Sequence, residues 1–363
     1  MTLAGPSLMI AAGGTGGHVF PGLALAAALV NQAGVRPTFV GTRRGLEASL
    51  VPSHGYAIET LDVEPMRGGG VVQGARGAYA AARAIGQALE IVRRTSPCVV
   101  VSIGGYAAGP VALAATMLGV PLALVEPNSI MGLSNRLLAP LARRIYLAFD
   151  QARTALSAAQ TRLSGVPLRE GFRPRARRPS AERRVLVLGG SLGAKALNER
   201  LPDALARARA DLGGADLVVV HQTGPGRDAA VREEYSRMGL AARVVPFSND
   251  LADDLAWADL VVARAGAGTI AEIAAVGRAA LLVPYPHAAD DHQAKNAAAY
   301  AVTGSAVWLR QADADSKHLS AELVRILSDD VVRDRLAVSA RAQGRPEAAR
   351  TIAADLLELA EVR

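Results

Sequence analysis

The residue best suited to proton transfer is His18, which stands directly after a glycine-rich loop near the N-terminus. This loop, residues 13–17, follows the apolar run Leu8–Ala12. An imidazole has a pKa near neutral pH, so it can take a proton from an attacking hydroxyl group. His18 is therefore a candidate general base, and Glu126, close to Asn128, is a second one. In the alternative interpretation, His18 only positions the loop or binds a diphosphate.

A second glycine-rich loop, residues 189–193, follows the apolar run 184–188. Where a parallel strand leads into a helix, the first backbone N–H groups of the helix have no helical partners and favour an anion such as phosphate. The first loop lacks the third glycine of a dinucleotide fingerprint, and neither loop has the Gly-Lys-Ser/Thr of a P-loop. The loops thus predict phosphate sites that serve neither NAD nor ATP hydrolysis, unless they are purely structural turns.

A third polar cluster, residues 264–272, follows the apolar run 260–263, and two interpretations of it stay open. Thr269 and Glu272 have the spacing of a capping box, which satisfies backbone donors at a helix start. Alternatively, the Glu272 carboxylate accepts hydrogen bonds from a ribose diol, while Gly268 and Thr269 donate to phosphate.

Alternating strands and helices are needed to position these loops. Short apolar runs alternate with longer Ala- and Leu-rich segments in two rounds, which predicts an α/β protein with two Rossmann-like parallel-sheet domains. The expected strands are residues 8–12, 38–40, 99–103, 122–125 and 144–148 in the first round and 184–188, 217–221, 243–246, 260–263 and 280–283 in the second.

The boundary between the domains falls near residue 167. We place the first domain at residues 1–167, completed by a C-terminal helix at 345–363, and the second at 168–344. Residues 171–180 carry prolines and like charges, so we interpret them as a solvated connection.

Composition narrows the class of protein. With 50% hydrophobic but only 4% aromatic residues, the chain suits small side chains packed on buried parallel strands. The single cysteine, Cys98, lies in an apolar run and indicates a buried thiol in a reducing compartment. We find neither a membrane-spanning run nor a signal sequence. The net charge of +7 comes without an aromatic-basic motif, which disfavours nucleic acid and leaves anionic lipid or a phosphorylated substrate.

Six segments in a fixed order give the chain a specific resemblance. They are GGTGGHVFPG at 13–22, GGYAAGP at 104–110, EPN at 126–128, GGSLGA at 189–194, RAGAGTIAE at 264–272 and DHQAKNA at 291–297. Through them nearly the whole chain resembles the MurG family of glycosyltransferases, which have the GT-B fold of two Rossmann-like domains facing a cleft. The resemblance implies inverting transfer of N-acetylglucosamine from UDP-N-acetylglucosamine to the 4-hydroxyl of the muramyl sugar of lipid I, forming lipid II for peptidoglycan.

The resemblance also implies which residues act. His18 would be the base on the acceptor hydroxyl, with Glu126 and Asn128 completing the catalytic set. Departing UDP would be stabilised by helix starts at Gly190 and Ser191 and at Gly268 and Thr269, with Arg169 or Arg264 supplying positive charge. The residues that would contact the donor are Thr15, Gly16, Gly17, Asn128, Arg169, Ser191, Ser248, Ala267, Gly268, Thr269, Ile270, Ala271, Glu272 and Gln293, with Glu272 on the ribose and Ser248 acting through its main chain.

Three positions depart from the family pattern. Leu192 and Pro127 stand where glutamine is common, and Val166 stands where asparagine is more common. Side-chain contacts to phosphate or to the acceptor at these positions would be lost or would be made by the backbone instead. The alternatives are a UDP-sugar epimerase, another glycolipid transferase of the same fold, or a catalytically inactive nucleotide-sugar sensor or membrane scaffold.

We expect no cofactor and no metal site. Asp313 and Asp315 match the Asp-x-Asp pattern of metal-dependent transferases, but a solvated turn before a helix is the simpler interpretation. His287 and His292 lie near two aspartates, in a loop that corresponds to the donor-sugar segment of the family.

Membrane contact is the last expectation, because lipid I carries a polyprenyl tail. The resemblance implies a peripheral protein on the cytoplasmic face of the bacterial cell membrane, with a role in cell-wall synthesis, cell shape and cell division. Residues 67–94 combine glycines with a helix that bears Arg76, Arg83, Arg93 and Arg94, which is compatible with an interfacial helix on anionic lipid. The alternative is a helix that packs on its own domain.

Overall fold

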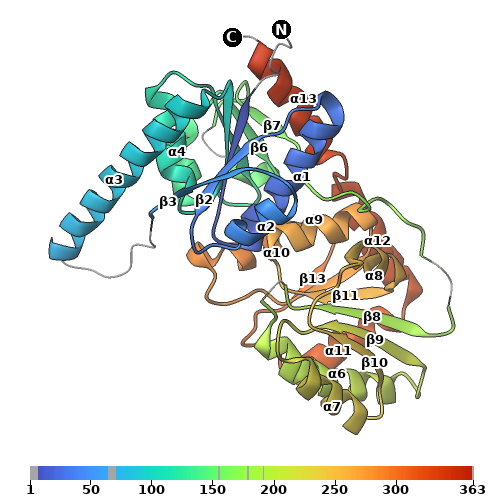
Figure 1. Cartoon of the computed structure of the whole chain (residues 1–363). Coiled ribbons are helices and arrows are strands. Elements are labelled where there is room, and N and C mark those ends of the chain that lie inside the picture. The colour runs from blue at the N-terminus through green and yellow to red at the C-terminus, as the bar shows by residue number, and fades with distance from the viewer. Residues whose placement is uncertain (1–6, 64–70, 154–155, 178–179, 191, 362–363) are drawn as a thin grey trace. The chain divides into compact units, whose positions relative to one another are not determined.

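A computed structural model describes residues 7–63, 71–153, 156–177, 180–190 and 192–361, with the backbone alone for 71–78. The chain forms two compact units (Figure 1). Unit 1 comprises Met1–Glu170 and Glu347–Arg363, and unit 2 comprises Gly171–Pro346. Each unit is built on one parallel β-sheet.

The sheet of unit 1 has strand order β3-β2-β1-β4-β5-β6-β7. Its strands are β1 Leu8–Ala12, β2 Thr38–Thr42, β3 Ile58–Leu61, β4 Val99–Gly104, β5 Leu122–Glu126, β6 Arg144–Leu147 and β7 Thr161–Leu163. Its helices are α1 Gly16–Ala33, α2 Glu47–Ser53, α3 Val71–Thr95, α4 Ala108–Met117, α5 Leu133–Leu138 and α13 Ala348–Glu361, with short 3-10 turns at Ala139–Leu141 and Asp150–Arg153.

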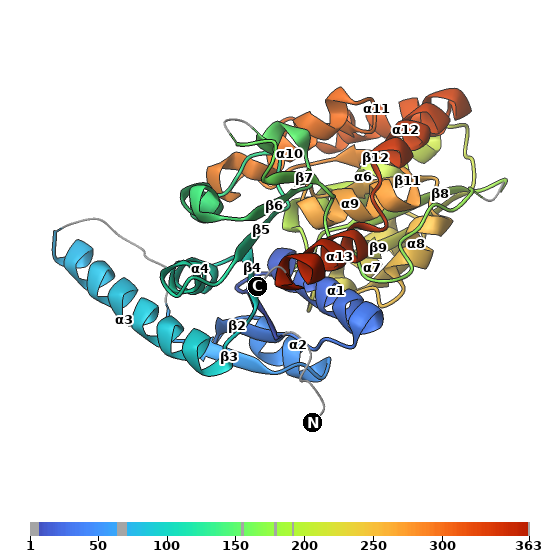
Figure 2. The ribbon, with the colours of Figure 1, turned by 90° about the horizontal axis from the view of Figure 1, so that it is seen from above.

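Both faces of this sheet are buried, which explains why β1 is apolar throughout. Alternate residues of β1 enter two separate cores, because successive side chains of a strand point to opposite faces. Leu8 and Ile10 pack with α1 and α13, whereas Met9 and Ala11 pack with α3 and α4. Figure 2 shows these two pairs of helices on opposite sides of the sheet. The C-terminal helix α13 thus completes one core of unit 1.

The sheet of unit 2 has strand order β10-β9-β8-β11-β12-β13. Its strands are β8 Arg183–Leu188, β9 Leu217–Gln222, β10 Ala241–Val245, β11 Leu260–Ala263, β12 Ala279–Leu282 and β13 Val307–Trp308. Its helices are α6 Lys195–Asp211, α7 Asp228–Arg237, α8 Leu251–Trp257, α9 Ala267–Val276, α10 His292–Val302, α11 Ser316–Leu327 and α12 Asp330–Gln343, with a 3-10 turn at Ala289–Asp291. Helices α6, α7 and α11 bury the face that carries Val185 and Val187.

Each strand expected from the sequence overlaps an observed strand, so the prediction of two parallel α/β sheets is confirmed. Three strands were not expected, namely β3, β7 and β13. All three lie at sheet edges; β3 and β7 include polar residues, and β13 is only two residues long. Their short, mixed sequences therefore lack the apolar run that marks a central strand.

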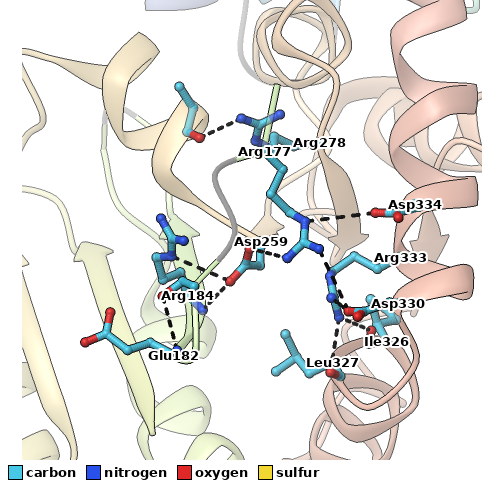
Figure 3. A network of polar contacts seen from close by, with 12 residues as sticks. Arg177, Glu182, Arg184, Asp259, Arg278, Ile326, Leu327, Asp330, Arg333 and Asp334 are labelled. Atoms are coloured by element: carbon cyan, nitrogen blue, oxygen red, sulfur yellow. Dashed lines mark hydrogen bonds and ion pairs between the residues drawn. The ribbon is translucent and has the colours of Figure 1, made fainter. Parts of the chain in front are cut away.

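The expectation of a solvated connection at residues 171–180 is wrong for Arg175 and Arg177, which form ion pairs with unit 2, whereas Arg173 is exposed as expected. Arg177 donates to Asp259, whose side chain is buried, at 3.2 Å, and the same carboxylate accepts the backbone N–H of Arg184 at 2.9 Å (Figure 3). Arg278 donates to the carbonyl of Arg175 at 2.8 Å. The connection is therefore attached to unit 2 by ion pairs and hydrogen bonds, because buried charges there need partners.

Cys98 also differs from expectation. It is only partly buried, at the edge of the core beneath α1. It lies one residue before β4, where the chain is still entering the sheet.

Candidate active site

The glycine loop of unit 1 joins the end of β1 to the start of α1, at the carboxyl edge of the sheet. Gly14 has a φ of +91°, a conformation that glycine adopts without strain. Thr15 is the N-cap of α1 in an extended conformation, with no side-chain cap bond. Thr15 and Gly17 are exposed, whereas Gly16 is buried. The loop therefore presents backbone donors of a helix start to the surface.

His18 is held against this loop. Its Nδ1 lies 3.2 Å from the carbonyl oxygen of Gly13 and 3.4 Å from Oγ1 of Thr15. A carbonyl oxygen only accepts, so Nδ1 carries the proton when the ring is neutral and Nε2 holds the lone pair. The ring is half-buried, and a Cβ on Gly104 would lie 3.0 Å from Nε2. The contact with Gly13 thus orients the His18 ring and makes Nε2 its basic nitrogen.

The end of β4 approaches the loop so closely that only glycine fits there. A Cβ on Gly105 would lie 2.2 Å from the carbonyl oxygen of Gly13, and Gly105 has a φ of +94°. Two segments more than 80 residues apart in sequence, around Gly13 and Gly105, therefore form one layer beneath His18.

Glu126 lies at the end of β5, and its side chain organises the loop that follows. One carboxylate oxygen accepts from the backbone N–H of Asn128 at 3.0 Å and from its Nδ2 at 3.1 Å. The other accepts from the N–H of Gly132 at 2.9 Å and from Nδ2 of Asn135 at 3.0 Å. Burial raises the pKa of Glu126, and these hydrogen bonds oppose the rise. With 1% of its surface exposed, the carboxylate is placed to hold the loop rather than to meet a substrate.

Asn135 was missed by sequence reasoning. It is buried on α5, and its Nδ2 donates both to Glu126 and to the carbonyl of Val125 at 3.1 Å. Its position in the sequence carries no motif, so only the tertiary contact reveals it.

Arg169 belongs to unit 1 in the structure. Its guanidinium lies 5.3 Å from the ring centroid of Phe20 on α1, a cation–π distance. This contact fixes the side chain beside the helix that carries His18.

The glycine loop of unit 2 is longer than expected. We expected a helix start at Gly190 and Ser191, and this is wrong, because α6 begins at Lys195. Ser191 itself lies outside the described residues. A Cβ on Gly193 would lie 2.0 Å from the carbonyl oxygen of Thr223, so the loop packs directly on the chain that leaves β9.

Gln222, at the end of β9, connects two loops and was not found from the sequence. Its Nε2 donates to the carbonyl of Gly190 at 3.1 Å, and its Oε1 accepts from the N–H of Ser248 at 3.3 Å. The Ser248 hydroxyl in turn donates to Asp254 at 2.6 Å. The buried amide of Gln222 therefore fixes the Gly190 loop relative to Ser248.

Helix α9 begins at Ala267, with Gly266 as its N-cap. Thr269 is the third residue inside the helix, so the capping-box interpretation of Thr269 and Glu272 is wrong. Gly268 faces open space, since a Cβ there would meet nothing within 4 Å. The first turn of α9 thus has room for a ligand at the positive end of a helix dipole.

Arg264, just before α9, is a buried cation. Its Nη1 donates to the carbonyls of Val283 and Pro284 at 2.9 and 3.1 Å, and its Nη2 donates to Oε1 of Gln311 at 2.7 Å. Burial lowers its pKa to about 10, which leaves it charged at neutral pH. Arg200 donates to the carbonyl of the same Gln311 at 2.6 Å. Within the described part of the chain, neither guanidinium makes an ion pair, so an anion would complete the site.

Gln293 is on the first turn of α10, and its Oε1 accepts from the N–H of Tyr285 at 3.0 Å. The Asp-x-Asp pattern ends at a helix cap, because Asp315 is the N-cap of α11 and accepts from the N–H of His318 at 2.8 Å.

The residues described contain no group of three His, Cys, Asp or Glu side chains that could hold a metal ion.

A buried polar network underlies the Gly190 loop. His221 accepts at Nδ1 from the Tyr235 hydroxyl at 2.9 Å and donates from Nε2 to Oδ1 of Asn198 at 3.1 Å. The Nδ2 of Asn198 donates to the carbonyl of Thr223, at 3.0 Å. Because Thr223 packs on Gly193, this network supports the loop from below.

His221 makes the stability of unit 2 depend on pH. Burial lowers its pKa from 6.5 to about 3, so the unfolded chain binds more protons between these values. The free energy of unfolding should therefore fall as the pH drops below 6.5, by at most about 1.4 kcal/mol per pH unit. Denaturant unfolding of the wild type and of His221→Gln at pH 7, 6 and 5 measures this slope. An equal slope in both proteins would contradict the assignment.

Two family models match the chain, one for each half of it. The glycosyltransferase family 28 N-terminal domain matches residues 8–147, and the glycosyltransferase family 28 C-terminal domain matches residues 184–352. In a comparison of structures, MurG from Acinetobacter baumannii is 32% identical with a TM-score of 0.81, covering 98% of this chain and 99% of that one. The chain belongs to the MurG group of glycosyltransferase family 28.

Curated relatives of the MurG group agree over nearly the full length. Two of these relatives are named UDP-N-acetylglucosamine–N-acetylmuramyl-(pentapeptide) pyrophosphoryl-undecaprenol N-acetylglucosamine transferase. The one from Sorangium cellulosum is 50% identical, covering 98% of this chain and 88% of its own length. The one from Acidithiobacillus ferrooxidans is 45% identical and covers 98% of both. The protein is therefore a glycosyltransferase with the GT-B fold.

The epimerase alternative finds support only at the level of the fold. A UDP-GlcNAc 2-epimerase from Neisseria meningitidis has a TM-score of 0.67 but only 10% identity, covering 97% of this chain and 100% of that one. A sequence identity this low shows that the two proteins share a fold, and it does not show that they catalyse the same reaction.

The departures of this chain from the MurG pattern lie in different surroundings. Leu192 is 81% exposed, so its side chain is available to a ligand. Val166 and Pro127 are buried, and Pro127 lacks a backbone donor. Only Leu192 thus places a changed side chain at the surface.

In this member of the MurG group, α3 packs on its own unit through its C-terminal half. Ala88 and Val92 are buried in the core shared with α4. Arg83 pairs with Asp62 at 3.3 Å, and Arg94 pairs with Glu59 at 2.8 Å. Arg76 lies outside the described side chains. Across the part of the chain that is described, no helix is long and apolar enough to cross a bilayer.

Proposed function

We propose that the protein transfers N-acetylglucosamine from UDP-N-acetylglucosamine to the 4-hydroxyl of the muramyl sugar of lipid I, giving lipid II and UDP. The observation that carries this proposal is the position of His18 on the glycine loop, where Nδ1 lies against a carbonyl oxygen and the lone pair of the neutral ring is therefore on Nε2. Half of the residues are shared with a transferase named for this reaction, which supports the choice of substrates.

The chemical step needs a proton acceptor and a stabiliser of the leaving group. Nε2 of His18 takes the proton of the acceptor hydroxyl as its oxygen attacks the anomeric carbon. The bond from that carbon to the diphosphate breaks in the same displacement, which inverts the configuration. The negative charge that develops on UDP is stabilised by the first turn of α9 and by Arg264.

We assign donor recognition to both glycine-loop regions and to α9. Glu272 binds the ribose, Ser248 acts through its main chain, and Gln293 binds the sugar. Arg169 contributes positive charge on unit 1. The other residues that we assign to donor contact are Thr15, Gly16, Gly17, Asn128, Ser191, Ala267, Gly268, Thr269, Ile270 and Ala271. Because the carboxylate of Glu126 accepts hydrogen bonds from the loop that follows it, including two from Asn128, we assign it the role of positioning Asn128.

A transfer assay tests the function. The protein is incubated with UDP-N-acetylglucosamine labelled in the sugar and with lipid I, with and without the chelator EDTA, and the lipid product is analysed. We expect labelled lipid II in both conditions and UDP release that depends on lipid I. Epimerised nucleotide-sugar without lipid product would refute the proposal.

We further propose peripheral association with the cytoplasmic face of the membrane. Two large apolar side chains of unit 1 are exposed. Met117, the last residue of α4, is 61% exposed, and Leu137 on α5 is 68% exposed. Leu141 and Arg143 line a surface pocket together with Thr116 of α4. Exposed apolar side chains beside an arginine suit an anionic bilayer surface.

Vesicle binding tests this association. Arg143→Ser should weaken co-sedimentation with phosphatidylglycerol vesicles about fivefold, since a basic residue near the surface contributes about 1 kcal/mol. Arg335→Ser, which removes an exposed arginine from α12 of unit 2, is the control. Equal loss in the two variants would mean that net charge, not this surface, binds lipid.

A further inference from the structure

A buried carboxylate that the motifs do not include stands behind the glycine loop of unit 1. Glu47, the first residue of α2, has no exposed surface. Its Oε1 accepts from the N–H and the hydroxyl of Thr42, both at 2.8 Å, and its Oε2 accepts from the N–H of Gly14 at 2.9 Å. Among the described residues no basic side chain pairs with it. Three donors therefore hold a carboxylate in a place where it is costly to bury.

The surrounding chain is shaped to accommodate this carboxylate. A Cβ on Gly13 would lie 2.8 Å from Oε1, and a Cβ on Gly45 would lie 2.1 Å from Oε2. A Cβ on Gly41 would lie 2.4 Å from Cγ of the same side chain. Any side chain at these three glycines would displace Glu47, so they form a pocket that fits its carboxylate.

One peptide group connects Glu47 to His18. The N–H of Gly14 and the C=O of Gly13 belong to the same planar peptide unit and point in opposite directions. Glu47 accepts from the N–H end, and Nδ1 of His18 lies 3.2 Å from the oxygen at the C=O end. A negative charge at the N–H end polarises the unit and makes its carbonyl a stronger acceptor, since hydrogen bonds in a chain strengthen one another.

We propose that Glu47 is the positioning residue of His18 and acts through the peptide group between Gly13 and Gly14. It fixes the ring as the Nδ1–H tautomer, and it stabilises the imidazolium that forms when Nε2 takes a proton. The effect on rate rests on the proposed role of His18 as base, whereas the effect on tautomer and protonation does not.

The other groups near the loop are compatible with this role. Arg43, between β2 and α2, pairs with Asp62 at 2.9 Å, so its charge is matched. The ring of Tyr106 would lie 3.9 Å from a Cβ on Gly14. Arg169 lies over Phe20 on α1, and Glu126 accepts hydrogen bonds from its own loop.

Glu47→Gln tests the proposal, because an amide keeps the shape but replaces one acceptor oxygen with a donor. In that variant a donor must face either Gly14 or Thr42, and the charge is gone. We expect NMR titration of His18 to show a pKa lower by about one unit and a mixture of tautomers. The acidic limb of the pH profile of kcat/KM should move to lower pH by the same amount. We expect kcat to fall about tenfold, with KM for UDP-N-acetylglucosamine nearly unchanged.

A matched control removes the same charge elsewhere in unit 1. Glu59 on β3 pairs with Arg94 at the surface, so Glu59→Gln should leave the titration of His18 and the pH profile unchanged. An unshifted His18 in Glu47→Gln would overturn the inference, whatever happens to activity. A shifted pKa and tautomer with full activity would instead refute His18 as the base and leave the role of Glu47 intact.

The wild-type protein offers a measurement that does not depend on folding of the variant. Its ¹⁵N spectrum at high pH should show His18 protonated at Nδ1 and unprotonated at Nε2. A neutral ring protonated at Nε2 would overturn the proposal, because the Gly13 carbonyl would then have no proton to accept.

Discussion

Replacing His18 with alanine should lower kcat for the transfer of N-acetylglucosamine to lipid I by about 10²- to 10⁴-fold, the contribution typical of a general base. KM for UDP-N-acetylglucosamine should change little, because the imidazole acts on the acceptor hydroxyl. Single-turnover transfer with labelled donor measures the chemical step directly. The fold should persist, since the His18 ring is only half-buried and its Nδ1 lies against Gly13 and Thr15 of its own loop.

The control for this change is His54→Ala, which removes an exposed histidine from the end of α2 and should leave kcat unchanged. Near-normal single-turnover transfer by His18→Ala would show that this residue only positions the loop or binds diphosphate. In that event the base must be sought elsewhere. Glu126 is poorly placed for the task, because both of its oxygens accept hydrogen bonds from the loop it supports.

The second large effect is expected at Arg264. Glutamine at this position removes a buried positive charge beside the first turn of α9, where we place the departing diphosphate. We expect kcat to fall by about 10²- to 10³-fold, the loss seen when one preorganised stabiliser of a developing charge is removed. UDP should also inhibit the variant more weakly. Steady-state kinetics with UDP as inhibitor measures both quantities.

Arg310→Gln is the matched control, because this arginine is exposed and lies over Trp308. A normal kcat in Arg264→Gln would mean that the guanidinium is structural, holding the carbonyls of Val283 and Pro284. Circular dichroism of the variant excludes unfolding as the cause of a loss. Arg264→Lys separates charge from geometry, since lysine restores the charge without the planar fork.

The glycine loops show how far spacing leads and where it stops. Spacing placed the loops at strand ends, and the structure confirms this for β1 and β8. It could not tell a helix start at Gly190 from one at Lys195, because the residue types between them do not show which residue takes the extended N-cap conformation that Ala194 has. Nor could it decide the capping box at Thr269, since the N-cap is set by the backbone angles of Gly266 and not by residue type alone.

Glu47 and Gln222 show a different limit. An acidic residue at the start of α2 resembles any favourable helix start, and a glutamine that ends β9 carries no pattern. Both become functional candidates only because strands distant in sequence bring partners to them. The N–H of Gly14 donates to Glu47, 33 residues away in the sequence, and the N–H of Ser248 donates to Gln222, 26 residues away.

The sequence by itself determined the two parallel sheets, the loops at their carboxyl edges and the family, because apolar periodicity and motif order are local properties of a chain. The tertiary structure decided which nitrogen of His18 is basic and which buried groups support each loop. It also decided that both carboxylate oxygens of Glu126 accept hydrogen bonds from the loop that follows β5. Those facts depend on hydrogen bonds between segments that are far apart in sequence, and such bonds are formed only when the sheets bring strand ends together.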